Sequence, residues 1–170
     1  MPNPTSELFQ PFDAESLGWL AAIVHDQRQA ALATLADGSP NLSMVAAVPE
    51  PGYDAFLLHL SELAAHKRNL RADPRCSLLL VQLGDGPAEL LQRRRVALDC
   101  TAVLLDKAAD DYAAAKARYL EALPRHTMMF QLADFDLVRL TVAGGLLNAG
   151  FGKAYRVTPA DLAAASLAVS

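Results

Sequence analysis

Helices are predicted where apolar residues return every three or four positions. The N-terminal helix, over about 14–28, has its apolar stripe at i, i+3, i+4 and i+7, and Asp13 is a suitable N-cap for it. Thr158-Pro159 is typical of an N-cap followed by the first helical residue, and predicts a short C-terminal helix over about 158–165. Each of these helices has one apolar face, so each is expected to pack against a core.

Between these helices the pattern in most segments changes to a period of two residues, which is typical of strands with one buried face, whereas the near-continuous apolar run at 76–81 is typical of a strand buried on both faces. Six strands are predicted, over 30–36, 41–48, 55–60, 76–81, 95–105 and 135–143. Asp37-Gly38 between the first two is a strong signal for a tight hairpin, and Gly144-Gly145 marks a turn or a bulge after the sixth. The sequence therefore predicts a mainly β fold, an antiparallel barrel over about 30–157 with α additions, in a single domain spanning residues 1–170.

The stretch 61–82, SELAAHKRNLRADPRCSLLLVQ, combines a helix signal with a cluster of basic side chains. Ser61 is a suitable N-cap, and the apolar spacing predicts a helix of about three turns that ends before Asp73-Pro74. A helix N-terminus with a hydroxyl group and nearby cationic side chains, here His66 and Lys67, favours an anion. The stretch is therefore a candidate phosphate site. The alternative is a capping serine followed by a solvated basic face.

Two further places in the predicted barrel have side chains suited to a ligand. Ser43 is a lone hydroxyl on a mostly apolar strand face, so it either contacts a ligand or forms a local hydrogen bond. Residues 150–153 place a glycine on each side of a strand phenylalanine, which allows a flat ligand or another backbone to approach and leaves Lys153 available for a charge. Cys76 and Cys100 lack metal or redox spacing and are expected to be reduced core thiols.

The composition limits the class of protein. A chain of 170 residues that is 52% hydrophobic is expected to be globular, because it can bury a sizeable core. Charged residues make up only 20%, so part of the apolar surface is expected to lie in an oligomer interface. A net charge of −4 argues against nucleic acid as the main partner. No apolar run reaches transmembrane length and the N-terminus lacks a secretory pattern, so no membrane partner and a cytoplasmic location are expected.

Several motifs together resemble the FMN-binding split-barrel superfamily of pyridoxamine 5′-phosphate oxidase-like proteins, in the branch that includes haem-utilisation proteins. They are AALATLADGSP at 30–40, the block S-x-L-A-x-H-x-x-N-L-x-x-D-P-R-x-S-L-L-L from Ser61, Tyr119-Leu120 before Pro124, Ala133-Asp134-Phe135, and Gly150-Phe151-Gly152-Lys153-Ala154. The resemblance implies a six-stranded antiparallel split barrel with flanking helices. It also implies a homodimer with two cofactor sites in the clefts between its subunits.

The resemblance further implies which residues form the cofactor site. Ser43, Met44 and Val45 would lie along the flavin, the corner at Leu60-Ser61 with His66, Lys67 and Asn69 would meet the phosphate, and Gly150, Phe151, Gly152 and Lys153 would complete the set. The chain departs from true pyridoxamine-phosphate oxidases, because Ser43 and Val48 stand where those enzymes carry Arg and Lys. His66 also stands at the position of a phosphate-binding Lys. The chain thus resembles an FMN-binding oxidoreductase other than pyridoxamine-phosphate oxidase.

Three functions are open at this point. The first is a flavoprotein, in which FMN at the dimer interface carries the oxidoreductase chemistry and the protein supplies position and electrostatics. The second is a haem-binding or haem-degrading protein that uses the same cleft, with an iron ligand among His25, His59, His66 and His126. The third is a cofactor-dependent sensor or storage module without turnover. No side chain is identified as a catalytic acid or base, and no separate metal site is predicted.

Overall fold

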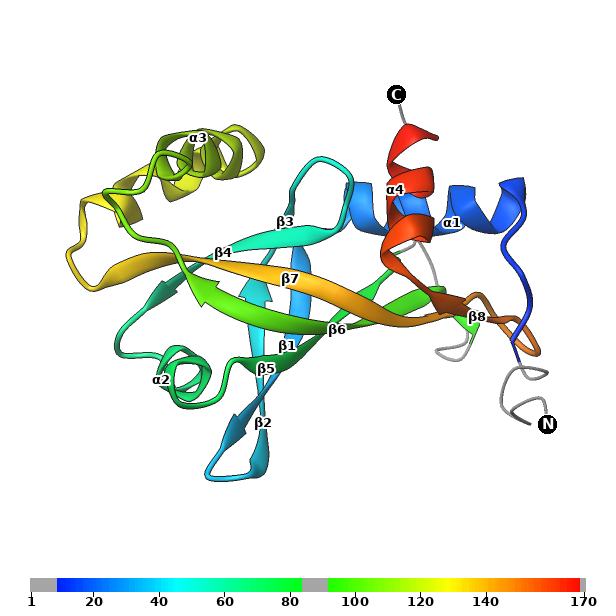
Figure 1. Cartoon of the computed structure of the whole chain (residues 1–170), viewed down its shortest axis with the longest axis horizontal. Coiled ribbons are helices and arrows are strands. Elements are labelled where there is room, and N and C mark those ends of the chain that lie inside the picture. Colours follow the sequence, from blue (N-terminus) through cyan, green and yellow to red (C-terminus); the bar gives the residue numbers. More distant parts are fainter. Residues whose placement is uncertain (1–8, 84–91, 169–170) are drawn as a thin grey trace.

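The computed structural model describes residues 9–83 and 92–168. Its helices are α1 (Ala14–Asp26), α2 (Ala65–Ala72), α3 (Tyr112–Ala122), the 3-10 helix η3 (Pro124–Gln131) and α4 (Pro159–Leu167). Its strands are β1 (Gln29–Ala36), β2 (Ser39–Ala46), β3 (Val48–Pro49), β4 (Ala55–Ser61), β5 (Arg75–Val81), β6 (Arg95–Leu104), β7 (Phe135–Asn148) and β8 (Ala154–Val157). The predicted mainly β fold with flanking helices is confirmed (Figure 1).

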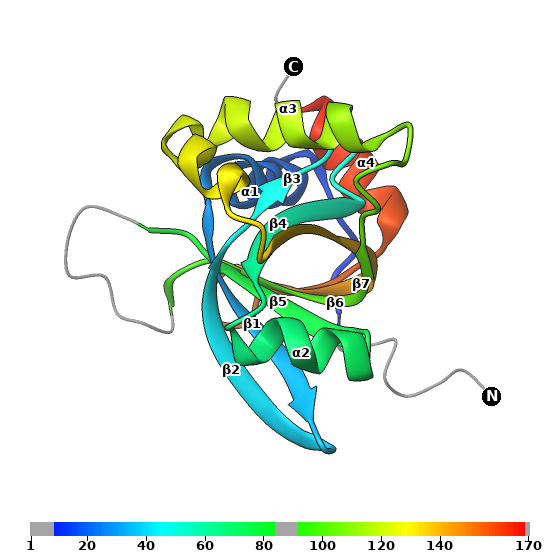
Figure 2. The same cartoon turned by 90° about the vertical axis from the view of Figure 1, so that its left-hand side faces the viewer.

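All strand pairs in the described residues are antiparallel, in the order β2-β1-β5-β6-β7-β4-β3, and β8 pairs with β7. The sheet curls into a half-open barrel (Figure 2), as the split-barrel resemblance implies. The predicted β1–β2 hairpin is confirmed, since Asp37 and Gly38 both have positive φ, at 52° and 79°, as a tight two-residue turn requires. The described chain has eight strands instead of six, because the predicted second strand divides into β2 and β3 and because β8 is separate.

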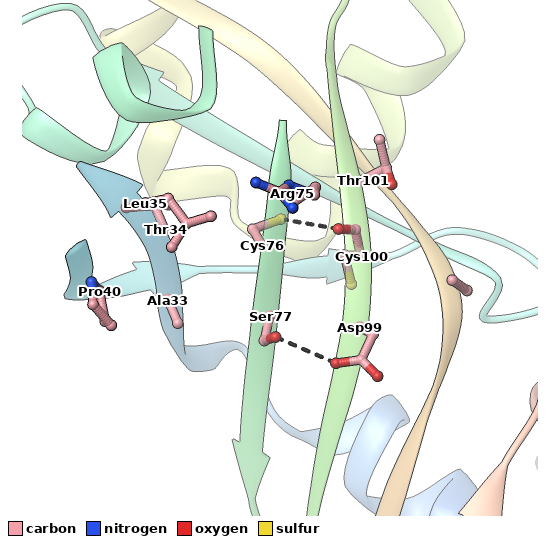
Figure 3. A pocket seen from close by; sticks show the side chains of 11 residues that line it. Ala33, Thr34, Leu35, Pro40, Arg75, Cys76, Ser77, Asp99, Cys100 and Thr101 are labelled. Atoms are coloured by element: carbon pink, nitrogen blue, oxygen red, sulfur yellow. Dashed lines mark hydrogen bonds between the residues drawn. The ribbon is translucent and has the colours of Figure 1, made fainter. Parts of the chain in front are cut away.

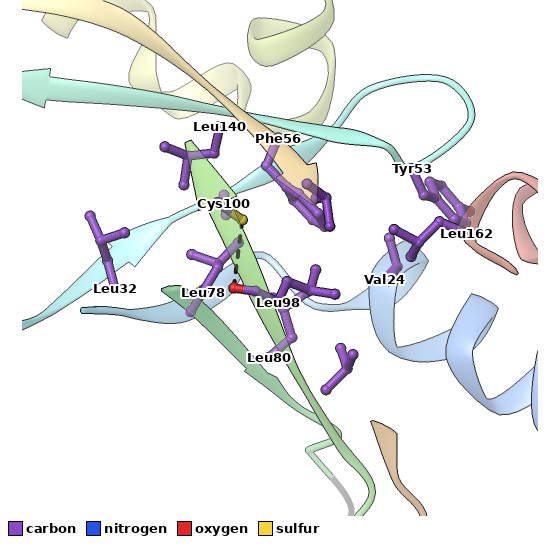
Figure 4. Close-up of a cluster of buried hydrophobic side chains, with 14 of the residues drawn as sticks. Val24, Leu32, Tyr53, Phe56, Leu78, Leu80, Leu98, Cys100, Leu140 and Leu162 are labelled. Carbon is purple, nitrogen blue, oxygen red and sulfur yellow. Dashed lines mark hydrogen bonds between the residues drawn. The ribbon is translucent and has the colours of Figure 1, made fainter. Parts of the chain in front are cut away.

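Alternating residues of the curled strands form the main core. Along β6, Val96, Leu98, Cys100 and Ala102 point inward, while the residues between them face outward. Helices α1 and α4 close one end of this core with Val24 and Leu162 (Figure 4). A second cluster beneath α3 and η3 covers the other face of β4, which explains why the whole of 55–60 is buried.

Of the two glycine pairs near the C-terminus, the first lies as one of its predicted alternatives and the second does not. Of the predicted turn or bulge at Gly144-Gly145, the bulge is confirmed: β7 continues for 14 residues, and its pairing with β6 shifts register opposite Asp99/Cys100. Gly145 is required there, since a Cβ atom would overlap the carbonyl oxygen of Ala97. Residues 150–153 were predicted as strand but form the turn between β7 and β8, with φ of 113° at Gly150 and 71° at Gly152.

The prediction that Ser61 caps α2 is wrong. Ser61 is the last residue of β4, and α2 begins at Ala65 after Ala64, which makes no side-chain capping bond. The Ser61 hydroxyl instead donates to Asp134 Oδ2 at 2.6 Å and accepts from the backbone N–H of Leu63 at 3.1 Å. The helix is therefore 8 residues long, shorter than the three turns expected, although it does end before Asp73-Pro74.

Candidate functional site

A buried lysine, Lys67, joins helix α2 to the end of the barrel. Lys67 is fully buried, and its Nζ lies 2.7 Å from Asp136 Oδ2 and 3.0 Å from Glu62 Oε2. The same ammonium group donates to the backbone oxygen of Asp134 at 3.0 Å. All of these partners lie on or beside the facing ends of β4 and β7, so Lys67 fastens α2 to the sheet. It is not available to a cofactor phosphate in this arrangement.

The other polar side chains of α2 are also engaged. Arg71 pairs with Glu62 and lies 3.6 Å from Asp136, and Arg68 donates to the backbone oxygens of Glu62 and Leu63. Asn69 Nδ2 donates to Thr34 Oγ1 at 3.0 Å, which ties the helix to the β1–β2 hairpin. The basic cluster seen in the sequence is therefore largely neutralised by its own surroundings.

The side chains of His66 and Ser43, unlike those above, are not engaged by neighbouring groups in the described residues. His66 is half-buried, and this burial lowers the pKa of its imidazole, so the ring is neutral at neutral pH. Within the described ranges neither the His66 ring nor the half-buried Ser43 hydroxyl makes a hydrogen bond. Large apolar side chains are exposed on the same hairpin and beside α2: Leu42 is 71% exposed, Met44 68% and Leu63 85%. Leu60 and Val45 are buried in the core.

A cavity of about 420 Å³ opens beside this region, over the outer ends of β1, β5 and β6 (Figure 3). It is lined by the small side chains Ala33, Thr34 and Ser77 and by Asp99, whose carboxylate accepts from the Ser77 hydroxyl at 3.4 Å. None of the residues that the sequence singled out for the cofactor lines it. The only sequence signal for it was the run of small residues on the outward positions of these strands.

Three of the four histidines lie elsewhere. His59 is 8% exposed and stacks on Phe130 with ring centroids 3.7 Å apart, and burial lowers its pKa to about 4. Its Nδ1 is buried without a hydrogen-bond partner in the described structure. His126 Nδ1 lies 2.9 Å from the Tyr119 hydroxyl. His25 is exposed at the end of α1. Iron ligation by His59 would require the core beneath η3 to open, and ligation by His25 or His126 would take place away from α2.

The turn at 150–153 lies at the opposite end of the molecule from α2 (Figure 1). Phe135, the first residue of β7, pairs with Ser61, whereas Asn148 at its other end pairs with Ala154. A strand of this length spans roughly 40 Å at the usual rise per residue. Phe151 is fully exposed, and Lys153 Nζ lies 4.7 Å from the centroid of the Trp19 ring. One chain therefore does not bring the two predicted halves of the cofactor site together.

The two cysteines are buried thiols, and burial raises the pKa of Cys76 to about 11. Among the described residues no three His, Cys, Asp or Glu side chains are grouped as a metal site would need. In the same part of the chain, no helix has the length and apolar character needed to cross a membrane.

Comparison with known proteins places these features in a family. The family model for pyridoxamine 5′-phosphate oxidase matches residues 19–148. The chain is 31% identical over 133 residues to the heme oxygenase HutZ of Vibrio cholerae. The aligned region covers 77% of this chain and 74% of that protein.

Two solved structures are similar along most of this chain. A heme-binding protein from Mycobacterium smegmatis is 28% identical with a TM-score of 0.79, and the match covers 91% of this chain but only 62% of that one. The structure of HutZ from Vibrio cholerae, described as a heme storage protein, is 25% identical with a TM-score of 0.65, covering 72% of this chain and 87% of that chain.

Proposed function

Because the chain belongs to the pyridoxamine 5′-phosphate oxidase family, we propose that it binds a planar cofactor in a cleft completed by a second subunit, and that this cofactor is haem. The sequence favoured FMN over haem, and the proposal places haem first and FMN second. Relatives described as a heme oxygenase, a heme-binding protein and a heme storage protein support haem over FMN.

The observation that carries the proposal is the contrast between His66 and Lys67. Haem iron takes a neutral imidazole, and His66 is neutral, half-buried and without a hydrogen-bond partner in the described chain. A cofactor phosphate needs free cations, and Lys67 is already paired with Glu62 and Asp136. The residues at this corner therefore fit an iron ligand better than a phosphate site.

The chain would contribute position and environment to a bound haem, which itself supplies an iron able to bind a small gas molecule. His66 would hold the iron, and the exposed side chain of Leu63 beside α2 would cover part of an apolar ring and exclude water from it. The half-buried Ser43 hydroxyl lies on β2, on the opposite face of that strand from Leu42 and Met44, and is available as a hydrogen-bond donor. Storage and turnover are both compatible with this assignment.

FMN is the second candidate, and one feature favours it. The residue before α2, Ala64, provides no side-chain cap, so the backbone N–H groups of Ala65 and His66 are left for another acceptor, while that of Lys67 donates to the Ala64 oxygen at 3.2 Å. A phosphate there would make the protein an FMN-binding oxidoreductase. His66 would then act as a cation, because a nearby dianion raises the pKa of an imidazole.

An absorption spectrum of the protein purified without added cofactor tests the proposal. We expect the Soret band of haem, and titration of the apoprotein should give tighter binding of haem than of FMN. His66→Ala should weaken haem binding about tenfold or more and shift the Soret band, whereas His126→Gln should leave both unchanged. Flavin bands with FMN binding restored by His66→Lys would overturn haem in favour of FMN. A haem spectrum that is unchanged in His66→Ala would remove His66 from the site.

We also propose that the second subunit is another copy of this chain. The outward face of β1, β2 and β5 carries the exposed side chains of Leu42 and Met44 next to Ala31, Ala33 and Leu79, which are only half-buried. An apolar sheet face of this kind is typical of a homodimer interface. A second copy would also supply a 150–153 turn to the α2 end, which a single chain leaves roughly 40 Å away.

A further inference from the structure

A second cavity, of about 370 Å³, lies on the other side of the sheet from α2. It is formed by the end of α1, the turn between β3 and β4, and one side of α3. Figure 1 shows this turn between α3 and α1 on the upper side of the sheet, with α2 on the lower side. The cavity shares no residue with the proposed haem site.

Two guanidinium groups face this cavity without a carboxylate partner. Arg118 on α3 is exposed and makes no hydrogen bond or ion pair within the described residues. Arg28, just after α1, donates through one nitrogen to the backbone oxygens of His25 at 2.5 Å and of Gln27 at 3.1 Å. Those bonds fix its position and leave the donors on its other nitrogens unused. Arginines without carboxylate partners are suited to a carboxylate or phosphate group.

The acidic residues of the cavity do not neutralise these arginines. Both carboxylate oxygens of Glu50 are taken by Arg139, at 2.5 and 3.1 Å, so Glu50 adds no free negative charge. Glu121 lines the cavity from α3 and forms no ion pair with Arg28 or Arg118 in the described structure. With two guanidiniums against one unpaired carboxylate, the lining is net positive.

Tyr53 adds a neutral hydrogen-bonding group at the floor of the cavity. Its φ is 58°, in the left-handed region that a tyrosine rarely adopts. The ring is only 7% exposed and packs near Val24 and Leu162 (Figure 4), while its hydroxyl lies 3.2 Å from Nδ1 of the exposed His25. Strained backbone conformations of this kind often occur where a side chain is held in place for a ligand.

We propose that this cavity binds a small oxyanion, the phosphate or carboxylate group of a metabolite. Arg28 and Arg118 hold the charge from opposite walls, and the Tyr53 hydroxyl and the His25 ring complete the hydrogen bonding. A volume of about 370 Å³ suits a compact metabolite. The site is separate from the haem site, so it would bind its ligand whether or not cofactor is present.

Titration of the full chain with inorganic phosphate, glycerol phosphate and succinate at constant ionic strength tests the site. The readouts are calorimetry and the NMR signals of the His25 imidazole. We expect saturable binding of at least one oxyanion, with the His25 signals shifting along the same curve. Arg118→Ala should weaken binding about tenfold, and Arg125→Ala, an exposed arginine on η3 outside the cavity, should not change it.

The anion that binds most tightly identifies the preferred group. Tyr53→Phe keeps the ring in the core and should weaken binding without lowering the melting temperature by more than a degree or two. The proposal is overturned if none of the three anions binds saturably. It is equally overturned if Arg118→Ala and Arg125→Ala weaken binding by the same amount, because the effect would then be general surface charge. His66→Ala should leave oxyanion binding intact, which separates this test from that of the haem site.

Discussion

At the scale of single residues, Lys67 is the position whose role changed most between sequence and structure. In the sequence it belongs to a basic cluster suited to phosphate, and in the structure it is a buried cation between two carboxylates. A buried charge is tolerated only while its partners remain, and removing one partner of such a pair typically costs about 3–5 kcal/mol. Its contribution is therefore to folding.

Lys67→Met is expected to lower the free energy of unfolding by about 3 kcal/mol, because Asp136 and Glu62 lose their shared cation. Urea unfolding followed by circular dichroism measures this change. Lys107→Met is the matched control, since this exposed lysine lies 3.4 Å from Asp136 and should matter by less than about 1 kcal/mol. A Lys67→Met variant that keeps full stability but has lost its cofactor would instead indicate that Lys67 binds the cofactor phosphate.

His59 should make folding depend on pH. The unfolded chain takes up a proton near the ordinary histidine pKa of about 6.5, whereas burial lowers the folded pKa to about 4. Between these values the unfolded state holds more protons, so stability falls as the pH falls. The expected loss for this group is about 2 kcal/mol between pH 7 and pH 5.

His59→Phe should abolish that part of the loss while keeping the stack on Phe130, and it removes a buried nitrogen that has no partner in the described structure. Unfolding free energies of wild type and variant at both pH values give the comparison. Equal pH dependence in wild type and His59→Phe would show that His59 titrates normally in the folded protein.

At the scale of elements, the pairing of the long strand β7 with β6 requires a glycine at position 145. Gly145→Ala is expected to destabilise the fold by several kcal/mol, because the added Cβ would overlap the backbone oxygen of Ala97, which the strand pairing holds in place. Gly18→Ala provides the contrast, since a Cβ at this position in α1 meets no atom within 4 Å. It should stabilise by roughly 0.5–1 kcal/mol through helix propensity. Melting temperatures of the two variants should therefore move in opposite directions.

At the scale of the whole molecule, the separation of α2 from the 150–153 turn makes assembly part of the proposed function. Light scattering should give about twice the 18.2 kDa mass of one chain. The double variant Leu42→Lys with Met44→Lys should shift the protein to monomers and weaken haem binding together, because like charges would meet across the interface. Leu167→Lys, which charges an equally exposed leucine on α4, should change neither property. A monomeric wild type that retains haem would contradict both the interface and the shared site.

The sequence by itself determined the features that depend on neighbouring residues. Asp37-Gly38 specified the hairpin, the alternation in β6 specified its buried face, and Asp13 capped α1 through Ser16 as expected. These follow from backbone conformation and burial, which act within a few positions of the chain. The family motifs likewise lie in short stretches, so the split-barrel fold was accessible without coordinates.

Only the tertiary structure decided which polar groups are free. Lys67 forms an ion pair with Asp136, and Ser61 forms a hydrogen bond with Asp134; each partner is about seventy positions away in sequence. These contacts form because β4 and β7 pair and bring their ends together. The cavity between Arg28 and Arg118 likewise forms only when α3 folds beside the end of α1. A charge pattern shows which groups the chain carries, but whether each is neutralised depends on contacts distant in sequence. The sequence could therefore propose the cofactor corner, and only the fold distinguished His66 from Lys67.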